Sequence, residues 1–158
     1  MKEIILFNKK VVLVDEEDYE RLSQYTWSYH NMGYAYTKTS RKTPPRLTFL
    51  MHRFIMQPKD NEEIDHINGN RLDNRKCNLR ICNRQENCRN QTVQKRNKSS
   101  IYKGVCWDTK RKKWMAYTKC NQKGIYIGHF DNEADAARAY NGKAKELFGE
   151  FAKLNEIK

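Results

Sequence analysis

A carboxylate, an imidazole and an amide occur within one short segment of the chain, at Asp65, His66 and Asn87. Carboxylate and amide oxygens are hard ligands suited to Mg²⁺, which keeps waters or substrate phosphate oxygens among its six ligands. An imidazole titrates near neutral pH and can take a proton from water as a general base. We therefore expect metal-assisted hydrolysis of a phosphodiester, with Mg²⁺ or another divalent cation such as Mn²⁺ as the cofactor.

The residues between these groups predict two short strands followed by a helix. The first strand is expected over residues 64–67, and an Asn-Gly turn separates it from a second strand over 78–81. Asn83 then caps a helix that begins RQEN, and Glu86 three residues later completes a capping box. In this arrangement the side chain of Asn87 can lean back toward the first strand.

The segment EIDHINGNRLDNRKCNLRICNRQENCRN resembles the HNH endonucleases, particularly the homing and phage-encoded type, through the pattern DH-x-x-G-N-x-x-x-N-x-x-x-N-L-R…N. The resemblance implies a ββα-metal fold in which Asp65 and Asn87 bind the metal ion. It also implies that His66 is the general base and that Asn78 braces the loop.

Two other interpretations of this segment are open. Asn, Asp and Gly favour turns, so the segment could be a solvated loop without chemistry. Cys77, Cys82 and Cys88 lie in the same stretch as His66, but they lack the C-x-x-C spacing of structural zinc sites. We interpret His52, in the apolar stretch LMHRFIM, as a structural residue.

Basic residues concentrate in the middle of the chain. The chain carries 31 Lys and Arg against 19 Asp and Glu, and residues 71–119 alone hold 15 Lys and Arg against 3 Asp and Glu. Such a block is typical of contact with the phosphate backbone of double-stranded DNA. A basic amphipathic helix, which binding to a membrane surface would require, is absent from the block. Seven of these basic residues are candidate DNA contacts: Arg71, Arg75, Lys76, Arg84, Arg89, Lys95 and Arg96.

Composition also divides the chain. The stretch QTVQKRNKSS is polar and basic, as flexible connectors are, and predicts a linker over residues 93–99. The nuclease domain is then expected over 1–92. It should contain a strand at VVLV, a short helix capped by Asp15 and a β-hairpin around NMG. The apolar run LTFLMHRFIM is either a strand or a helix.

Residues 100–158 predict a second domain. Three aromatic-rich strands, IYKGVCW, KWMAYTK and KGIYIGHF, precede a helix that Asn132 caps. Strand alternation directs Trp114, Ala116 and Thr118 to one face of the middle strand, where they can pack on the Ala-rich helix. Met115, Tyr117 and Lys119 lie on the opposite face.

This second domain resembles the Apetala and ethylene-response-factor type of DNA-binding domain. The resemblance implies a sheet in the major groove, with DNA contacts from Lys103, Tyr117, Lys119 and Tyr126. Plant members carry arginines where this chain has Lys103, Cys106 and Lys119, and a lysine cannot make the two-point contact of arginine with guanine. GIYIG at 124–128 superficially resembles GIY-YIG nucleases, but its two triplets overlap and the segment already forms a strand.

We therefore predict an α+β protein with an N-terminal ββα-metal nuclease domain and a C-terminal three-stranded antiparallel sheet packed on one helix. The expected function is a metal-dependent DNA endonuclease that nicks or cuts specific sites. The alternative is a sequence-specific DNA-binding regulator without catalysis. No stretch has the length of a membrane span and the N-terminus lacks a signal peptide, so we expect a cytoplasmic monomer of a bacterial host or phage-infected cell. Five cysteines, an odd number, predict free thiols.

Overall fold

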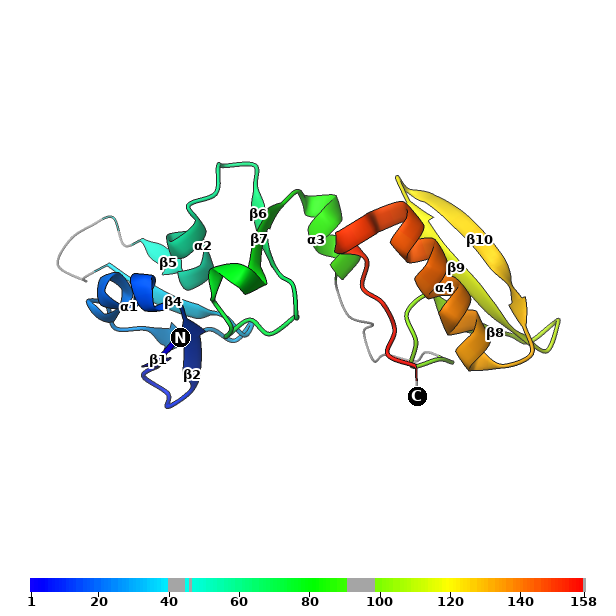
Figure 1. Ribbon diagram of the computed structural model, residues 1–158, viewed down its shortest axis with the longest axis horizontal. Coiled ribbons are helices and arrows are strands. Elements are labelled where there is room, and N and C mark those ends of the chain that lie inside the picture. Colours follow the sequence, from blue (N-terminus) through cyan, green and yellow to red (C-terminus); the bar gives the residue numbers. More distant parts are fainter. Residues whose placement is uncertain (40–44, 46, 91–98, 158) are drawn as a thin grey trace. The chain divides into compact units, whose positions relative to one another are not determined.

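The computed structural model describes residues 1–39, 45, 47–90 and 99–157 of the chain (Figure 1). It separates into two compact units, Met1–Asn87 and Cys88–Lys158, and both combine small antiparallel sheets with helices. The predicted α+β class is thus confirmed. The linker predicted over 93–99 lies outside the described residues except for Ser99, and so do the candidate DNA contacts Lys95 and Arg96.

The first unit begins with a β-hairpin and a short helix. Strand β1 (Lys2–Ile5) pairs with β2 (Val11–Val14), and α1 (Glu16–Ser23) follows. The sequence predicted β2 but missed β1. Helix α1 begins after Asp15, as expected, and acidic residues fill its first turn. The side chain of Asp15 makes no capping hydrogen bond to the helix, however, because its carboxylate accepts a hydrogen bond from the Lys76 N–H instead.

A second sheet and a helix complete the core of this unit. Strands β3 (Ser28–Tyr29), β4 (Ala35–Lys38) and β5 (Thr48–Leu50) form an antiparallel sheet in that order, which confirms the predicted hairpin. The apolar run that could be strand or helix is both, because β5 leads directly into α2 (Met51–Met56). The core of this unit includes five almost fully buried side chains: Val12, Val14, Leu22, Trp27 and Met51.

The segment with the candidate catalytic residues forms a strand pair and a helix. Strand β6 (Glu63–His66) pairs antiparallel with β7 (Leu79–Cys82), and α3 (Arg84–Asn90) follows. The predicted capping box is confirmed: Asn83 Oδ1 accepts from the Glu86 backbone N–H at 3.0 Å, and Glu86 Oε2 accepts from the Asn83 N–H at 2.8 Å. The second strand begins one residue later than predicted, because Asn78 lies in a 3₁₀ turn, η1 (Lys76–Asn78).

The second unit is a three-stranded antiparallel sheet with one long helix. Strands β8 (Val105–Asp108), β9 (Lys113–Cys120) and β10 (Lys123–Phe130) are arranged in the order β10-β9-β8. Asn132 caps helix α4 (Glu133–Phe148), because its Oδ1 accepts from the Asp135 N–H at 2.8 Å. A short 3₁₀ turn, η2 (Gly149–Phe151), follows the helix. Small residues of α4 let the helix pack closely on Val105 and Ala116 of the sheet.

The two faces of β9 differ sharply in exposure. Ala116 and Thr118 are buried on the side of α4, while Tyr117 and Lys119 are exposed. This difference agrees with the alternation of side chains that the sequence predicts along this strand. All five cysteines are free thiols, as predicted. Within the described part of the chain, no helix is long and apolar enough to span a membrane.

Candidate active site

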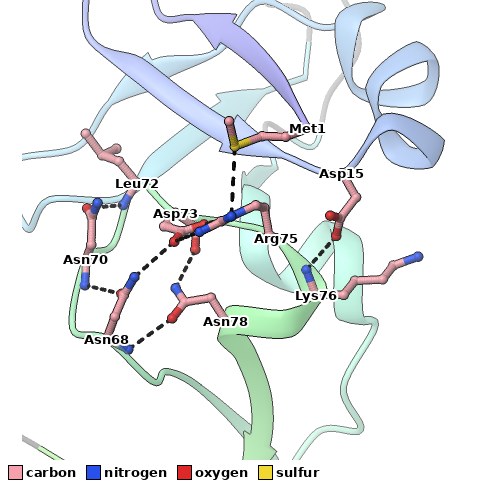
Figure 2. A network of polar contacts seen from close by, with 9 residues as sticks. All are labelled: Met1, Asp15, Asn68, Asn70, Leu72, Asp73, Arg75, Lys76 and Asn78. Carbon is pink, nitrogen blue, oxygen red and sulfur yellow. Dashed lines mark hydrogen bonds and ion pairs between the residues drawn. The ribbon is translucent and has the colours of Figure 1, made fainter.

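Asparagine side chains brace the loop that joins β6 to β7 (Figure 2). Asn68 Oδ1 accepts from the Asn70 N–H at 2.7 Å, and Asn70 Oδ1 accepts from the Leu72 N–H at 3.1 Å. Asn78 spans the loop, because its Oδ1 accepts from the Asn68 N–H at 3.0 Å and its Nδ2 donates to the Asp73 carbonyl at 2.8 Å. The amides expected of a turn-rich loop are therefore present, and they fix the loop that separates the two strands.

The same loop is tied to the N-terminal hairpin and α1. The Leu13 N–H donates to the Leu72 carbonyl and the Asn74 N–H donates to the Leu13 carbonyl, at 2.9 and 2.8 Å. The Lys76 N–H donates to Asp15 Oδ2 at 2.7 Å, which is the contact that takes the Asp15 side chain away from its helix. The candidate nuclease segment is thus not separate from the first 18 residues of the chain.

Two candidate DNA contacts take part in this bracing. Arg75 donates from Nε and Nη2 to the two carboxylate oxygens of Asp73, each at 2.7 Å, and this ion pair lowers the pKa of Asp73. Lys76 pairs through Nζ with Glu17 and Asp18 of α1. The DNA contacts of Arg75 and Lys76 remain predictions, and phosphate would have to replace these carboxylates as their partners.

Asp65 is buried and paired with Arg80. The register of the hairpin places Asp65 on β6 directly opposite Arg80 on β7. Arg80 donates from Nη2 and Nε to Asp65 Oδ2, at 2.6 and 3.0 Å. The sequence pattern included Arg80 but gave it no role. Because opposite charges compensate each other, the Arg80 guanidinium is a suitable partner for a carboxylate on a residue that is only 6% exposed.

His66 follows Asp65 on β6 and is equally buried. Its Nε2 lies 3.4 Å from Asn74 Oδ1, and Asn74 Nδ2 lies 3.4 Å from the Arg71 carbonyl. Because the amide nitrogen of Asn74 is turned to that carbonyl, its oxygen faces the ring and favours the tautomer with hydrogen on Nε2. Nδ1 is then the basic nitrogen. Burial lowers the pKa of His66, which keeps the ring neutral and able to accept a proton.

Two aromatic side chains surround this imidazole. The ring of His52 meets His66 edge to face at a centroid distance of 5.2 Å, and Tyr34 lies 4.9 Å from His52 and 6.0 Å from His66. Burial lowers the pKa of His52 to about 3, so the two histidines pack without repulsion. Among the described residues, His52 Nδ1 has no hydrogen-bond partner. The guanidinium of the candidate DNA contact Arg71 lies over the Tyr34 ring, 4.6 Å from its centroid.

Asn87 reaches β6 from α3, but it meets Glu63 and not the strand's catalytic candidates. Its Nδ2 donates to Glu63 Oε2 at 2.6 Å. Because an ionised carboxylate only accepts hydrogen bonds, Glu63 holds the nitrogen of the amide and leaves its oxygen as the group that can bind a cation. The sequence pattern had predicted no role for Glu63.

The oxygen donors of Asp65 and Asn87 fit a hard divalent cation. No group of three or more His, Cys, Asp and Glu side chains that could hold a metal ion exists among the residues described. Asp65 and Asn87 would offer a metal ion one carboxylate and one amide, and water and the phosphate of the substrate would complete a ligand set that suits Mg²⁺.

The remaining candidate DNA contacts lie on α3 and in the second unit. Arg84 is exposed at the start of α3. In the second unit, the Arg89 guanidinium lies over the Phe148 ring at 4.7 Å, and Lys103 Nζ donates to the Arg89 carbonyl. On the open face of the sheet, Tyr117 and Tyr126 are paired across β9 and β10, and Lys119 is paired with Gly124.

Comparison with known proteins matches both segments. Residues 56–89 match the family model of an HNH endonuclease, and residues 100–150 match that of the AP2 domain. An uncharacterized HNH endonuclease of Acanthamoeba polyphaga mimivirus is 33% identical over 138 residues, which cover 86% of this chain and 70% of that protein. No solved structure matches. With its HNH segment and its AP2-type DNA-binding domain, the chain belongs to the HNH endonuclease family.

Proposed function

We propose that this endonuclease hydrolyses phosphodiester bonds of double-stranded DNA with the help of a divalent metal ion, and that a ββα-metal module formed by β6, β7 and α3 carries the reaction. The observation that supports the proposal most is that two adjacent residues of β6 supply a buried, neutral imidazole and a buried carboxylate, His66 and Asp65. Water near His66 can lose its proton to the ring, because a neutral imidazole is a competent base.

The proposed reaction assigns one task to each of four side chains. Asp65 and Asn87 hold the metal ion, which supplies positive charge against the phosphate and the leaving oxygen when it is bound. His66 takes the proton of the attacking water, so a new bond forms from that oxygen to phosphorus as the bond to the 3′ oxygen breaks. Asn74 holds the His66 ring in the tautomer that this transfer requires. We further propose that one monomer, with one such site, nicks one strand of its target in the manner of homing-type enzymes.

Supercoiled plasmid tests the proposed reaction directly. The purified full chain should convert it to the open circular form in the presence of Mg²⁺ or Mn²⁺, and EDTA should stop the conversion. Linear product without an open circular intermediate would contradict nicking by a monomer. Equal cleavage with and without EDTA would contradict the dependence on a metal ion.

Asp65→Ala and Asn87→Ala should each move half-maximal cleavage to a higher Mg²⁺ concentration, because each removes one of only two protein ligands. We expect a shift of at least about 10-fold, since even outer-shell substitutions cost roughly 10- to 100-fold in metal affinity. Gln85→Ala is the matched control, because Gln85 is an exposed amide of the same helix as Asn87. Mg²⁺ titrations of both variants that overlay the wild type would place the metal site elsewhere.

Lys119→Ala should weaken binding of the second unit to DNA. Lys119 is exposed on β9, on the face opposite α4, where an ammonium group can meet a phosphate. A phosphate contact predicts a similar loss on target and scrambled duplexes and a salt dependence whose slope falls by roughly one unit. Lys145→Ala is the control, since Lys145 is an exposed lysine of α4. Unchanged affinity at every salt concentration would mean that this face does not bind DNA.

A further inference from the structure

Three side chains on the second unit form a hydrogen-bonded chain that the nuclease site does not involve. Tyr126 Oη lies 2.6 Å from His129 Nδ1, and His129 Nε2 lies 3.0 Å from Asp108 Oδ2. Tyr126 and His129 come from β10, and Asp108 ends β8. The chain runs outward from a mostly buried carboxylate to an exposed phenol, because Tyr126 is 60% exposed.

Asp108, at the inner end of these hydrogen bonds, accepts hydrogen bonds and cannot donate them. Asp108 Oδ1 accepts from the backbone N–H groups of Lys110 and Arg111, at 3.0 and 3.1 Å, and Asp108 Oδ2 lies 3.2 Å from the Arg111 guanidinium. The Arg111 backbone N–H contributes most to lowering the pKa of Asp108, which is about 2. An ionised carboxylate has no hydrogen, so the contact with His129 requires the hydrogen to be on His129 Nε2.

This requirement fixes the direction of the next hydrogen bond. A neutral imidazole with hydrogen on Nε2 presents a bare lone pair at Nδ1. When the ring carries hydrogen on Nε2 alone, the hydroxyl of Tyr126 donates its single hydrogen to His129 Nδ1. Its oxygen is left with lone pairs alone, so Tyr126 presents only a hydrogen-bond acceptor to solvent.

We propose that Tyr126 is a specificity-determining residue that reads the exocyclic amino group of one adenine or cytosine in the major groove, and that His129 and Asp108 position its hydroxyl as an acceptor. The inference rests on the proposed binding of DNA by the open face of this sheet. Phosphate oxygens, guanine O6 and N7, and thymine O4 all accept hydrogen bonds, so none of them can pair with an acceptor. Adenine N6 and cytosine N4 are the amino donors in that groove.

The neighbouring side chains agree with a base contact at this position. Tyr117 lies directly opposite Tyr126 on β9 and is 45% exposed, so two phenols stand side by side on the open face. Among the described contacts, no hydrogen bond fixes the direction of the Tyr117 hydroxyl, whereas one does for Tyr126. Tyr117→Phe therefore serves as a matched control that removes an exposed hydroxyl of undetermined direction from the same face.

The experiment uses the full chain with His66→Ala, so that DNA is bound without being cut. Duplexes are selected by binding from a random-sequence pool at pH 8, above the range in which imidazoles ordinarily protonate. This His66→Ala chain is the parent of the other variants, and it should prefer adenine or cytosine at one position of its site. Tyr126→Phe should lose this preference at that position alone, and Tyr117→Phe should keep it. His129→Phe frees the phenol hydrogen, so discrimination against guanine and thymine should disappear at the same position.

A base analogue then identifies the atom that is read. Purine in place of adenine, or 2-pyrimidinone in place of cytosine, removes only the amino group. Affinity of the parent should fall roughly 10-fold, within the range of a specific base contact, beyond any loss that the analogue causes with Tyr126→Phe. Four affinities are compared: those of the parent and of Tyr126→Phe, each for the natural base and for the analogue. The comparison separates the contact between the Tyr126 hydroxyl and the amino group from the effect of the analogue on the duplex itself.

The outcomes distinguish failure of the role of Tyr126 from failure of the proposed DNA binding. Tight binding with the same base preferences in the parent and in Tyr126→Phe would overturn the role of Tyr126 and leave DNA binding intact. A parental preference for guanine or thymine at the position that depends on Tyr126 would overturn the direction of the hydrogen bond. Failure of the parent to bind any duplex would instead overturn the proposed binding of DNA by the sheet.

Discussion

His66→Ala protein is expected to cleave DNA roughly 10²- to 10⁴-fold more slowly than the wild type, which is the usual contribution of a general base. Its affinity for DNA should change little, because the buried ring is proposed to act on water and not on the duplex. Single-turnover cleavage at saturating enzyme measures the loss, and a binding titration in EDTA measures the affinity.

Added imidazole distinguishes a base from a merely structural ring. The substitution leaves a hole of about the size of imidazole between Asn74 and the rings of Tyr34 and His52. Free imidazole that enters it should restore part of the cleavage rate. Wild-type cleavage by His66→Ala without imidazole would remove His66 from the reaction.

Gly104→Ala is expected to have the largest effect on stability. Gly104 has a φ of +73°, and a Cβ there would lie 2.1 Å from Tyr140 Cδ2 and 2.6 Å from the Tyr117 carbonyl oxygen. A left-handed backbone costs a non-glycine residue about 1–2 kcal/mol, and overpacking a core costs about 1–3 kcal/mol more. We expect the free energy of unfolding of the second unit to fall by about 3 kcal/mol or more. Hydrogen exchange of the β9 amides measures it, with an expected acceleration of roughly 100-fold.

Gly142→Ala supplies the control for this substitution. Gly142 lies within α4, and a Cβ at this position meets no heavy atom within 4 Å. Alanine should stabilise the helix by about 0.5–1 kcal/mol, so exchange should slow. Exchange in β9 at the wild-type rate in Gly104→Ala would show that Tyr140 moves aside at little cost.

Features that depend on neighbours in the chain could be predicted from the sequence. The capping box of α3 involves residues three apart, and the exposure of β9 follows a period of two, so local chemistry determines both. For the same reason, the helix after Asp15 begins where its acidic first turn predicts. The exact start of β7 was wrong by one residue, because the side chain of Asn78 bonds across the loop and holds its backbone in a turn.

Contacts between distant parts of the chain could not be predicted in this way. The hydrogen bond from Arg80 to Asp65 joins residues 15 apart, that from Asn87 to Glu63 joins residues 24 apart, and that from Lys76 to Asp15 joins residues 61 apart. Residue types and spacing identify Asp65 and Asn87 as candidates, but only the fold shows which partner holds each side chain. Arg75 and Lys76 were likewise assigned to DNA by charge alone, whereas both pair with nearby carboxylates.

The ties between the β6–β7 loop and the start of the chain limit how this nuclease can be engineered. The family match begins at residue 56, yet the loop within it depends on Leu13, Asp15 and Glu17 for backbone pairing and charge. A cassette cut at the edge of the match would lose these partners and leave Lys76 and the backbone of Asn74 to water. A transplantable form of the enzyme must therefore carry the N-terminal hairpin and the first turn of α1 as part of its catalytic cassette.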